Sequence, residues 1–346
     1  MNMRIDYKDK TVTMMDVAQM AGVSKSTVSK ALSRKPGVSS ATYENILKVC
    51  KDLNYSMNPN IQDFIRKTIG GGTKNIAFVL GQQEFGDPAY ARFIDGIAKG
   101  AEESNYHVVF AKLSGQEQST FDLPLIIRDH RVDGIILSGR IEEYTISLIR
   151  ELGIPYVMLG TYNNSIAQDS LTVELDISLG MHKIIETLRS LGRTRISYFT
   201  ECLNTYAEEK TFLAYQSALK DNGLEFYEEL VYIGNGPFSG AIDRLTGVFE
   251  QEKLPFDALL CIDFRSASEI SHMMWGYYGP GGSTKVILAT GRPYDYYKLP
   301  LFAVYLYPMN EEMAYQGFNL LLKKITNPED FVTSKILLSP TIEAVG

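Results

Sequence analysis

The stretch VSKSTVSKAL, Val23 to Leu32, predicts one short amphipathic helix. Its apolar positions recur at helical spacing, at Val28, Ala31 and Leu32. The opposite face carries the polar side chains of Lys25, Ser26, Ser29 and Lys30. Ser24 precedes the helix and is well placed to cap it. Hydroxyl and ammonium groups therefore face outward from the N-terminal half of this helix.

Two further helices are predicted beside it. Thr13 precedes an apolar rhythm at Val17, Met20 and Ala21, which Gly22 ends. After Lys35-Pro36-Gly37, the cap candidates Ser39 and Ser40 open a third helix. The inner positions of that helix are Ile46, Val49, Cys50 and Leu53. Three short helices joined by tight turns are typical of a helix-turn-helix unit.

The outward face of the central helix is suited to DNA. The N-terminal half of a recognition helix enters the major groove and meets base edges there. Lysine can donate to guanine O6 and N7, and serine can serve a base or a phosphate. For so short a string, a solvated helix face is the alternative interpretation. The position of KSTVSK (Lys25 to Lys30) directly after Ala-Gly-Val-Ser favours the DNA interpretation.

The segment from Thr13 to Tyr55 resembles the head of the lactose-repressor/galactose-repressor (LacI/GalR) family of bacterial transcription regulators. The matching motifs are DVAxxAGVS (Asp16 to Ser24), TVS[RK]xL (Thr27 to Leu32), VSxxT (Val38 to Thr42) and LNY (Leu53 to Tyr55). The resemblance implies base-reading roles for Lys25, Ser26 and Lys30, with Ser29 on the same DNA-facing side. The positions that it implies to contact phosphates are Thr13, Ser24, Thr27, Ser39 and Thr42. Lys30 stands where the family often has Arg, so a point-charge donor replaces a bidentate fork.

The next segment, YSMNPNIQDFIRKTIGGGTKN, departs from the hinge pattern of that family. Asn58 matches, and Phe64 stands where the family places a leucine that wedges into the minor groove. Phenylalanine suits such a wedge, because apolar side chains of several kinds unstack base steps. The alternative is that Phe64 packs against the body or a partner chain. Gly70-Gly71-Gly72 is a linker composition and marks the boundary of the head.

Charge is divided unevenly along the chain. The net charge is −7, yet residues 1–70 hold 11 basic and 6 acidic residues, so the rest carries −12. A basic head on an acidic body is typical of a nucleic-acid-binding module attached to another domain. The sequence shows neither an apolar run long enough for a membrane span nor an N-terminal apolar stretch, so we expect a cytoplasmic protein. Four scattered histidines and the lack of a nucleophile motif argue against an enzyme.

From Lys74 onward the sequence alternates short apolar runs with amphipathic helices. This alternation predicts an α/β body of parallel sheets covered by helices on both faces. About 270 residues exceed one ordinary sheet, so we expect two lobes. The predicted divisions are a helix-turn-helix head at 1–58, a hinge and linker at 59–73, and a body at 74–346. Lobe 1 is expected at about 74–168 and 307–328, and lobe 2 at about 169–306 and 329–346.

The body resembles the periplasmic-binding-protein-like effector domain of the same family. The similar segments are DPAYARFIDGI (Asp87 to Ile97), VELDISLG (Val173 to Gly180), GPFSG (Gly236 to Gly240) and PFDALLCID (Pro255 to Asp263). The effector-binding residues that the resemblance implies are Asp87, Tyr90, Asp176, Phe238 and Asp263. Carboxylates and an aromatic ring suit the hydroxyls and the apolar face of a sugar.

Two departures in the body change where positive charge lies. Thr211, beside Lys210, replaces a family arginine, and Arg292 stands near an expected carboxylate. A cation at Arg292 suits an anionic ligand, although an ion pair with an acidic neighbour is the commoner role for such a residue.

These observations predict a DNA-binding regulator, a repressor, that binds a pseudo-palindromic operator as a homodimer or a tetramer. No cofactor is expected, and a sugar or sugar derivative between the lobes is the expected effector. The alternatives are a regulator of this fold controlled by a protein partner or by an anionic non-sugar ligand. A solute-binding protein without a regulatory role would leave the head unexplained.

Overall fold

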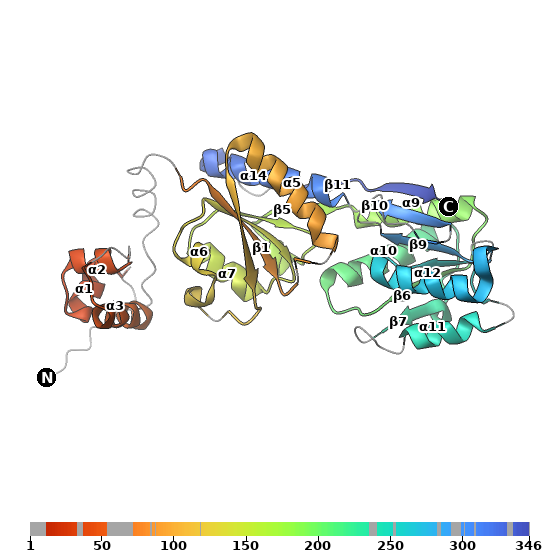
Figure 1. Ribbon diagram of the computed structural model, residues 1–346, viewed down its shortest axis with the longest axis horizontal. Coiled ribbons are helices and arrows are strands. Elements are labelled where there is room, and N and C mark those ends of the chain that lie inside the picture. Colours follow the sequence, from red (N-terminus) through yellow and green to blue (C-terminus); the bar gives the residue numbers. More distant parts are fainter. Residues whose placement is uncertain are drawn as a thin grey trace.

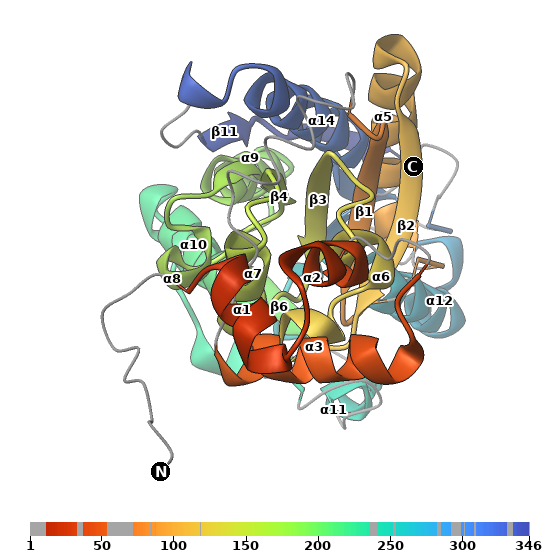
Figure 2. The ribbon, with the colours of Figure 1, turned by 90° about the vertical axis from the view of Figure 1, so that its left-hand side faces the viewer.

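The computed structural model describes residues 12–32, 37–53, 72–83, 85–86, 88–117, 119–234, 241–251, 254–281, 285–291, 299–300, 302–307, 309–330 and 335–345 (Figure 1). The head consists of α1 (Met14–Ala21), α2 (Lys25–Leu32) and α3 (Ser40–Asp52), which contact one another (Figure 2). Gly22 adopts φ +66°, a left-handed conformation that ends α1 at low cost for glycine. Val17, Val28 and Ile46 are fully buried between the three helices. The predicted helix-turn-helix fold is confirmed.

The first lobe is built on a six-stranded sheet in the order β11-β5-β4-β3-β1-β2, with all pairs parallel. Its strands are β1 (Asn75–Gly81), β2 (His107–Leu113), β3 (Gly134–Gly139), β4 (Tyr156–Leu159), β5 (Leu171–Leu175) and β11 (Lys335–Leu338). Its helices are α5 (Pro88–Ser104), α6 (Leu125–Arg128), α7 (Glu143–Glu151), α8 (Asn164–Ala167) and α14 (Asn310–Thr326), with the short turns η1 (Thr120–Asp122) and η4 (Pro328–Asp330). Helices α5 and α14 cover one face of the sheet, and α6 and α7 cover the other.

The second lobe repeats this plan with the strand order β12-β10-β9-β8-β6-β7. Its strands are β6 (Ile196–Thr200), β7 (Val231–Ile233), β8 (Ala258–Leu260), β9 (Ile287–Gly291), β10 (Ala303–Tyr307) and β12 (Thr341–Val345), of which β12 is antiparallel to β10. Its helices are α9 (Ile177–Ser190), α10 (Tyr206–Asp221), α11 (Ala241–Phe249) and α12 (Phe264–Tyr278), with η2 (Glu228–Leu230) and η3 (Gly279–Gly281). Helices α9 and α10 lie on one face, and α11 and α12 on the other.

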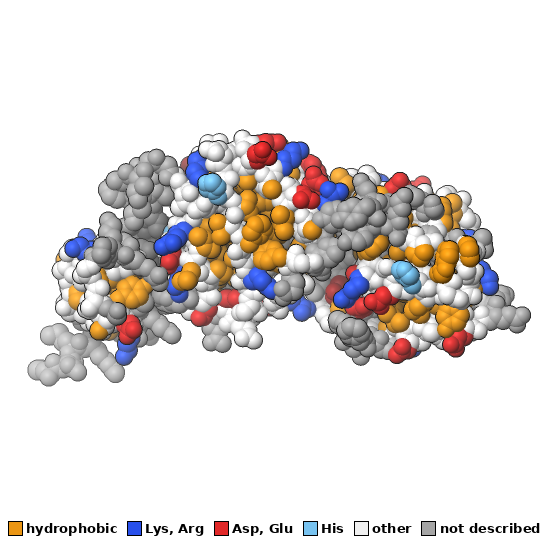
Figure 3. Space-filling view, viewed as in Figure 1, with side chains coloured by type: hydrophobic (Ala, Val, Ile, Leu, Met, Phe, Trp, Pro, Cys, Tyr) orange, Lys and Arg blue, Asp and Glu red, His pale blue; other side chains and the backbone are white. Residues whose placement is uncertain are grey.

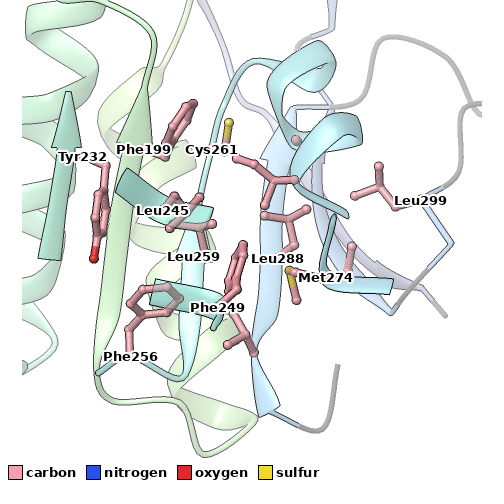
Figure 4. Close-up of a cluster of buried hydrophobic side chains, with 14 of the residues drawn as sticks. Phe199, Tyr232, Leu245, Phe249, Phe256, Leu259, Cys261, Met274, Leu288 and Leu299 are labelled. Atoms are coloured by element: carbon pink, nitrogen blue, oxygen red, sulfur yellow. The ribbon is translucent and has the colours of Figure 1, made fainter. Parts of the chain in front are cut away.

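The core of each lobe follows the period-two alternation of its strands. In β1, Ile76 and Phe78 face α5 and α14, whereas Ala77 and Val79 face α6 and α7. In the second lobe, Phe199, Leu259 and Leu288 point into the cluster beneath α11 and α12, which Figure 4 shows. Strands buried on both faces have continuous apolar sequences, which is why the sequence predicted this α/β body, and the fold class is confirmed.

The sheet order places the crossings between the lobes later than we expected. Strand β5, expected in lobe 2, pairs with β4 in the first sheet, and β11, also expected in lobe 2, pairs with β5. Three connections therefore pass between the lobes, after β5, after β10 and after β11. In the described part of the chain, no helix is both long enough and apolar enough to span a membrane.

Candidate nucleic-acid interface and effector site

Helix α2 presents the polar face that its periodicity predicted. The side chains of Lys25, Ser26, Ser29 and Lys30 are all exposed. Val28 and Ala31 are buried, at 0% and 1% exposure, and Leu32 is partly buried against the head core. The hydroxyls and ammonium groups of α2 are thus available on one surface of the head.

Each head helix begins at a hydroxyl cap. Thr13 and Asp16 form a reciprocal capping box on α1, with the Thr13 N–H donating to Asp16 Oδ2 at 2.7 Å. On α2, Ser24 Oγ accepts from the Thr27 N–H at 3.1 Å. On α3, Ser39 Oγ accepts from the Thr42 N–H at 3.2 Å. The cap prediction for Ser24 and Ser39 is confirmed.

The five residues predicted to contact phosphates all belong to these caps. They are Thr13, Ser24, Thr27, Ser39 and Thr42. A helix N-terminus carries free backbone N–H groups and the positive end of the helix dipole, so it favours an anion. The structure therefore places these residues at helix N-termini, and their contacts with phosphates stay a prediction.

The hydroxyls at the start of α2 form a small cluster. Ser24 Oγ lies 2.8 Å from Ser26 Oγ and 2.8 Å from Thr27 Oγ1. The Ser26 hydroxyl therefore already has a partner in the chain without DNA. Because a hydroxyl has one donor and two acceptor sites, Ser26 can keep this contact while it contacts a base edge, or it can leave Ser24 through a change of rotamer.

Several predicted site residues lie outside the described residues. They are Asn58 and Phe64 of the hinge, and Asp87, Phe238 and Arg292 of the effector site. Their assignments stay predictions.

In the body, the carboxyl ends of the strands of both sheets meet at the lobe boundary. Arg140 follows β3, and its Nη2 donates to the carbonyl oxygen of Asn204, which follows β6, at 2.9 Å. The Arg140 N–H also donates to Gly81 O at the end of β1. A Cβ on Gly81 would lie 2.2 Å from Arg140 O, so only glycine fits this approach. Ligands of open α/β sheets bind outside the carboxyl ends of the strands.

Three predicted effector residues are described, and each follows the carboxyl end of a strand. Asp176 follows β5 and caps α9, accepting from the Leu179 N–H at 2.9 Å. Asp263 follows β8 and caps α12, accepting from the Ser266 N–H at 2.9 Å. Tyr90 lies in the first turn of α5, with its ring 5.9 Å from that of Phe93. Both carboxylates thus have a structural role as helix caps.

The sequence prediction missed Glu174, a carboxylate at the same boundary. Glu174 lies on β5 and is 1% exposed. Lys335 on β11 places its Nζ 2.8 Å from Oε1, and Lys210 on α10 of the second lobe places its Nζ 3.7 Å from Oε2. A charged residue inside the apolar run LTVEL is the one local signal that could have indicated it.

Tyr162 contributes a neutral hydroxyl near this carboxylate. Its Oη donates to Gly139 O at 3.1 Å, at the carboxyl end of β3. Burial, followed by the proximity of Tyr90, raises the pKa of Tyr162 above its ordinary value. The hydroxyl therefore stays a hydrogen-bond donor at neutral pH.

A second polar group, also missed, lies beyond β6 and β8. Ser266 Oγ lies 2.6 Å from Asp263 Oδ2 and 3.0 Å from Glu201 Oε1, and Arg265 Nη2 lies 2.9 Å from Glu201 Oε2. The cluster joins acceptors and one exposed cation, a set that suits hydroxyl-bearing or anionic ligands. Nowhere in the described ranges do three or more His, Cys, Asp or Glu gather as a metal site would require.

Comparison with known proteins agrees with this architecture. Residues 13–58 match the family model "Bacterial regulatory proteins, lacI family". The chain is 26% identical over 228 residues to the HTH-type transcriptional regulator MalR of Streptococcus pneumoniae, covering 65% of this chain and 67% of MalR. A structure of the transcriptional regulator CelR with cellobiose superimposes with a TM-score of 0.66, at 21% identity over 96% of this chain and 98% of CelR. A structure of the lac repressor dimer bound to operator gives a TM-score of 0.62, at 17% identity over 97% of this chain and 98% of the repressor chain.

Proposed function

The chain belongs to the lacI family of bacterial regulatory proteins, and on this premise we propose that it is a sequence-specific DNA-binding transcriptional repressor controlled by a small molecule. The single observation that carries the proposal is the exposed donor face of α2, flanked by three hydroxyl-capped helix N-termini. The repressor works in the cytoplasm, where bacterial DNA lies.

In this proposal the head divides its contacts between backbone and bases. The caps of α1, α2 and α3 hold phosphates and fix the register of the head on the duplex. Lys25, Ser26 and Lys30 then reach base edges in the major groove. The basic balance of residues 1–70 favours this association and makes it sensitive to salt.

Two copies of the chain bind one operator in this proposal. The lac repressor structure contains a dimer on its operator, and a two-fold protein pairs naturally with a pseudo-palindrome. Hydrophobic side chains gather over the first lobe on the face that Figure 3 shows. Phe110 on edge strand β2 is 49% exposed, and Trp275 on α12 is 43% exposed. Exposed apolar surface of this kind favours burial against a second copy.

The effector binds between the lobes, where the carboxyl ends of both sheets meet. A sugar or sugar derivative is supported by the carboxylates of Asp176 and Asp263 and by the structural likeness to the cellobiose-bound CelR. Asp87, Phe238 and Arg292 would complete the site. A change in lobe closure on binding alters operator affinity by a coupling of about 1–3 kcal/mol.

An anionic ligand is the second candidate effector. Lys210 reaches the lobe boundary from α10 and is 32% exposed, so it can turn to a phosphate or carboxylate. Titration of the operator complex with a panel of sugars and their phosphates separates the two classes. In Lys210→Gln an anionic effector loses the cation that binds it, whereas a neutral sugar is affected only through the loss of the Lys210–Glu174 ion pair.

Selection of genomic DNA fragments by the purified protein at near-physiological salt tests the proposal. We expect a palindromic motif among the retained fragments. Lys25→Ala with Lys30→Ala should abolish the motif, and Lys220→Ala on the second lobe serves as the control. Retention without any motif for the unmodified chain would contradict sequence-specific regulation.

A further inference from the structure

We infer that Asp133 is a positioning residue for operator binding, because it fixes the point at which the segment carrying the head leaves the first lobe. This inference rests on the proposed function. Asp133 directly precedes β3 and so lies at the amino ends of the strands of the first sheet. The lobe boundary lies at the opposite, carboxyl ends of these strands. Asp133 therefore lies outside both the recognition helix and the candidate effector site.

The carboxylate of Asp133 accepts three hydrogen bonds from Thr73 and Lys74, which directly precede β1. Its Oδ1 accepts from the Thr73 N–H at 2.7 Å and from Thr73 Oγ1 at 2.9 Å, and its Oδ2 accepts from the Lys74 N–H at 3.0 Å. The side chain is buried, with Asp133 5% exposed. Hydrogen bonds to an ionised carboxylate are among the strongest in proteins, so this grip holds two consecutive residues of the main chain.

The approach to Asp133 requires glycine at position 72. A Cβ at Gly72 would lie 2.2 Å from Asp133 Oδ2 and 2.6 Å from its Cγ. A side chain there would push the carboxylate out of place. The third glycine of the linker therefore has a packing role, beyond the conformational freedom that its composition suggests.

Lys74 is held from the other side as well. Its backbone adopts φ +56°, a conformation that costs energy for any residue other than glycine. Its carbonyl oxygen accepts from the His107 N–H at 2.7 Å, and its Nζ lies 4.4 Å above the Tyr106 ring. Asp133, β2 and Tyr106 together impose one geometry on this residue.

The anchor is connected to the lobe boundary by a single buried strand. Asp133 precedes β3 and Arg140 follows it, and Arg140 contacts Asn204 of the second lobe. The seven residue-to-residue steps from Asp133 to Arg140 span roughly 23 Å at the usual rise of a strand. Because β3 and its neighbour β1 are buried, they move as a rigid unit. A change in lobe closure thus reaches the exit point of the head.

The second lobe offers a matched control. Asp257 precedes β8 and accepts from the Thr194 N–H at 3.0 Å and the Arg195 N–H at 3.0 Å. This contact ties the connection between α9 and β6 to the start of β8 within one lobe, and no head is attached there. If Asp133 only stabilises the start of a strand, replacing it and replacing Asp257 should have the same effect on operator binding.

The test uses the full-length chain with Asp133→Ala, Gly72→Ala, Asp257→Ala and Gly247→Ala. Gly72→Ala displaces the carboxylate without removing it, so it keeps the inference testable if Asp133→Ala fails to fold. Gly247 has open space around its Cβ position and controls for the added methyl group. Hydrogen exchange of the amides of Thr73 and Lys74 reports the anchor without any DNA.

Operators whose half-site spacing is changed by one base pair report the positioning. Half-site spacing is set by the geometry of the protein, so we expect the unmodified chain to lose about 10-fold or more in affinity on the altered site. Asp133→Ala and Gly72→Ala should expose the two amides and lower this spacing penalty to about twofold, because unanchored heads adapt to either spacing. Asp257→Ala and Gly247→Ala should leave the spacing penalty unchanged.

The inference would be overturned if Asp133→Ala speeds exchange of the Thr73 and Lys74 amides but leaves the spacing penalty unchanged. It would also be overturned if Asp257→Ala lowers the spacing penalty as much as Asp133→Ala does. If the unmodified chain selects no operator at all, the proposed function fails, and the inference with it. The amide exchange distinguishes these cases, because it tests the anchor itself in the absence of DNA.

Discussion

At the scale of single residues, the proposed recognition of DNA depends on how α2 presents a few flexible donors. Lys30 is exposed on the helix face opposite Val28, where the family often has arginine. An ammonium group is a point charge on a flexible stem, whereas a guanidinium offers a fixed fork. Base discrimination by this head should therefore be softer at one operator position than it would be with arginine.

Replacing Lys30 with Ala tests this assignment. We expect base preference to relax at one position of each half-site, with a loss of about 1–3 kcal/mol for the preferred base. Affinities for operators carrying each base at that position provide the measurement. A loss that is uniform across all four bases would show that Lys30 contacts phosphate only.

Glu174 receives one cation from each lobe, so the two lysines form a matched pair. Lys335 belongs to the first lobe and Lys210 to the second. Lys210→Gln should shift the effector concentration that half-saturates the operator response by about two- to fivefold, the range of a partly exposed ion pair. Lys335→Gln should change that concentration less, because it breaks a contact inside one lobe. Equal shifts in both variants would contradict a role for Lys210 in lobe closure.

His182 on α9 contacts α10 through Asp221, with Nε2 to Oδ2 at 2.7 Å, and its Nδ1 lies 2.9 Å from Ser178 O. The Ser178 carbonyl, and next Asp221, raise the pKa of His182 above 6.5, and the bond from His182 lowers the pKa of Asp221. Folding therefore favours charged His182. Its stabilising contribution is complete below its unfolded pKa and is lost as pH rises through its folded pKa. The stabilising contribution of Asp221 is present above its unfolded pKa and is lost as pH falls through its lowered, folded pKa.

Thermal unfolding of His182→Ala checks the sign. The melting temperature of this variant should fall furthest below that of the unmodified chain near about pH 6, and the difference should shrink towards about pH 8.5. His272→Ala controls for the carbonyl contact, because its Nδ1 lies 2.7 Å from a carbonyl oxygen four residues back on α12, so the difference between the two variants measures the contribution of Asp221. A deficit that is constant with pH would contradict the assignment.

At the scale of elements, periodicity predicted most of the helices and strands but not how all of them pair. The mainly apolar runs of β1, β3 and β6 were evident because both faces of each strand are buried. Strand β11 was not, since its exposure alternates and its run KILL is short. Its partner β5 lies more than 150 residues earlier, and no local pattern records that pairing.

The site divides in the same way. The α2 face follows from spacing within one helix, so it could be predicted. The contacts of Glu174 with Lys210 and of Asp133 with Thr73 join residues 36 and 60 positions apart, and they exist only once the sheets have formed. Asp176 and Asp263 were predicted from resemblance, and the structure adds that both cap helices.

The hinge provides a prediction for the element between head and body. If Phe64 wedges into the minor groove, Phe64→Ala should weaken specific binding and reduce the bend in the operator, because an inserted ring unstacks a base step. Bending is measured by the mobility of complexes on circularly permuted fragments. Unchanged bending, or an equal effect from Ile65→Ala, would favour the alternative in which this segment packs against the body or a partner chain.

At the scale of the whole molecule, two similar lobes meet at the carboxyl edges of their sheets, and the head is joined to the opposite edge of the first lobe. In the proposed function, a ligand at the boundary and DNA at the head therefore act on opposite ends of the same strands. Coupling of this kind is reciprocal, so operator DNA must change effector affinity by the same factor as the effector changes operator affinity.

The most direct measurement of the central claim is the affinity of the purified chain for its selected palindrome and for a shuffled sequence of the same length, by fluorescence anisotropy over a series of salt concentrations. A sequence-specific regulator should prefer the palindrome by roughly 1,000-fold or more at physiological salt. Equal affinities that fall together with salt would show that the head binds only the charge of the DNA backbone, and would contradict the account.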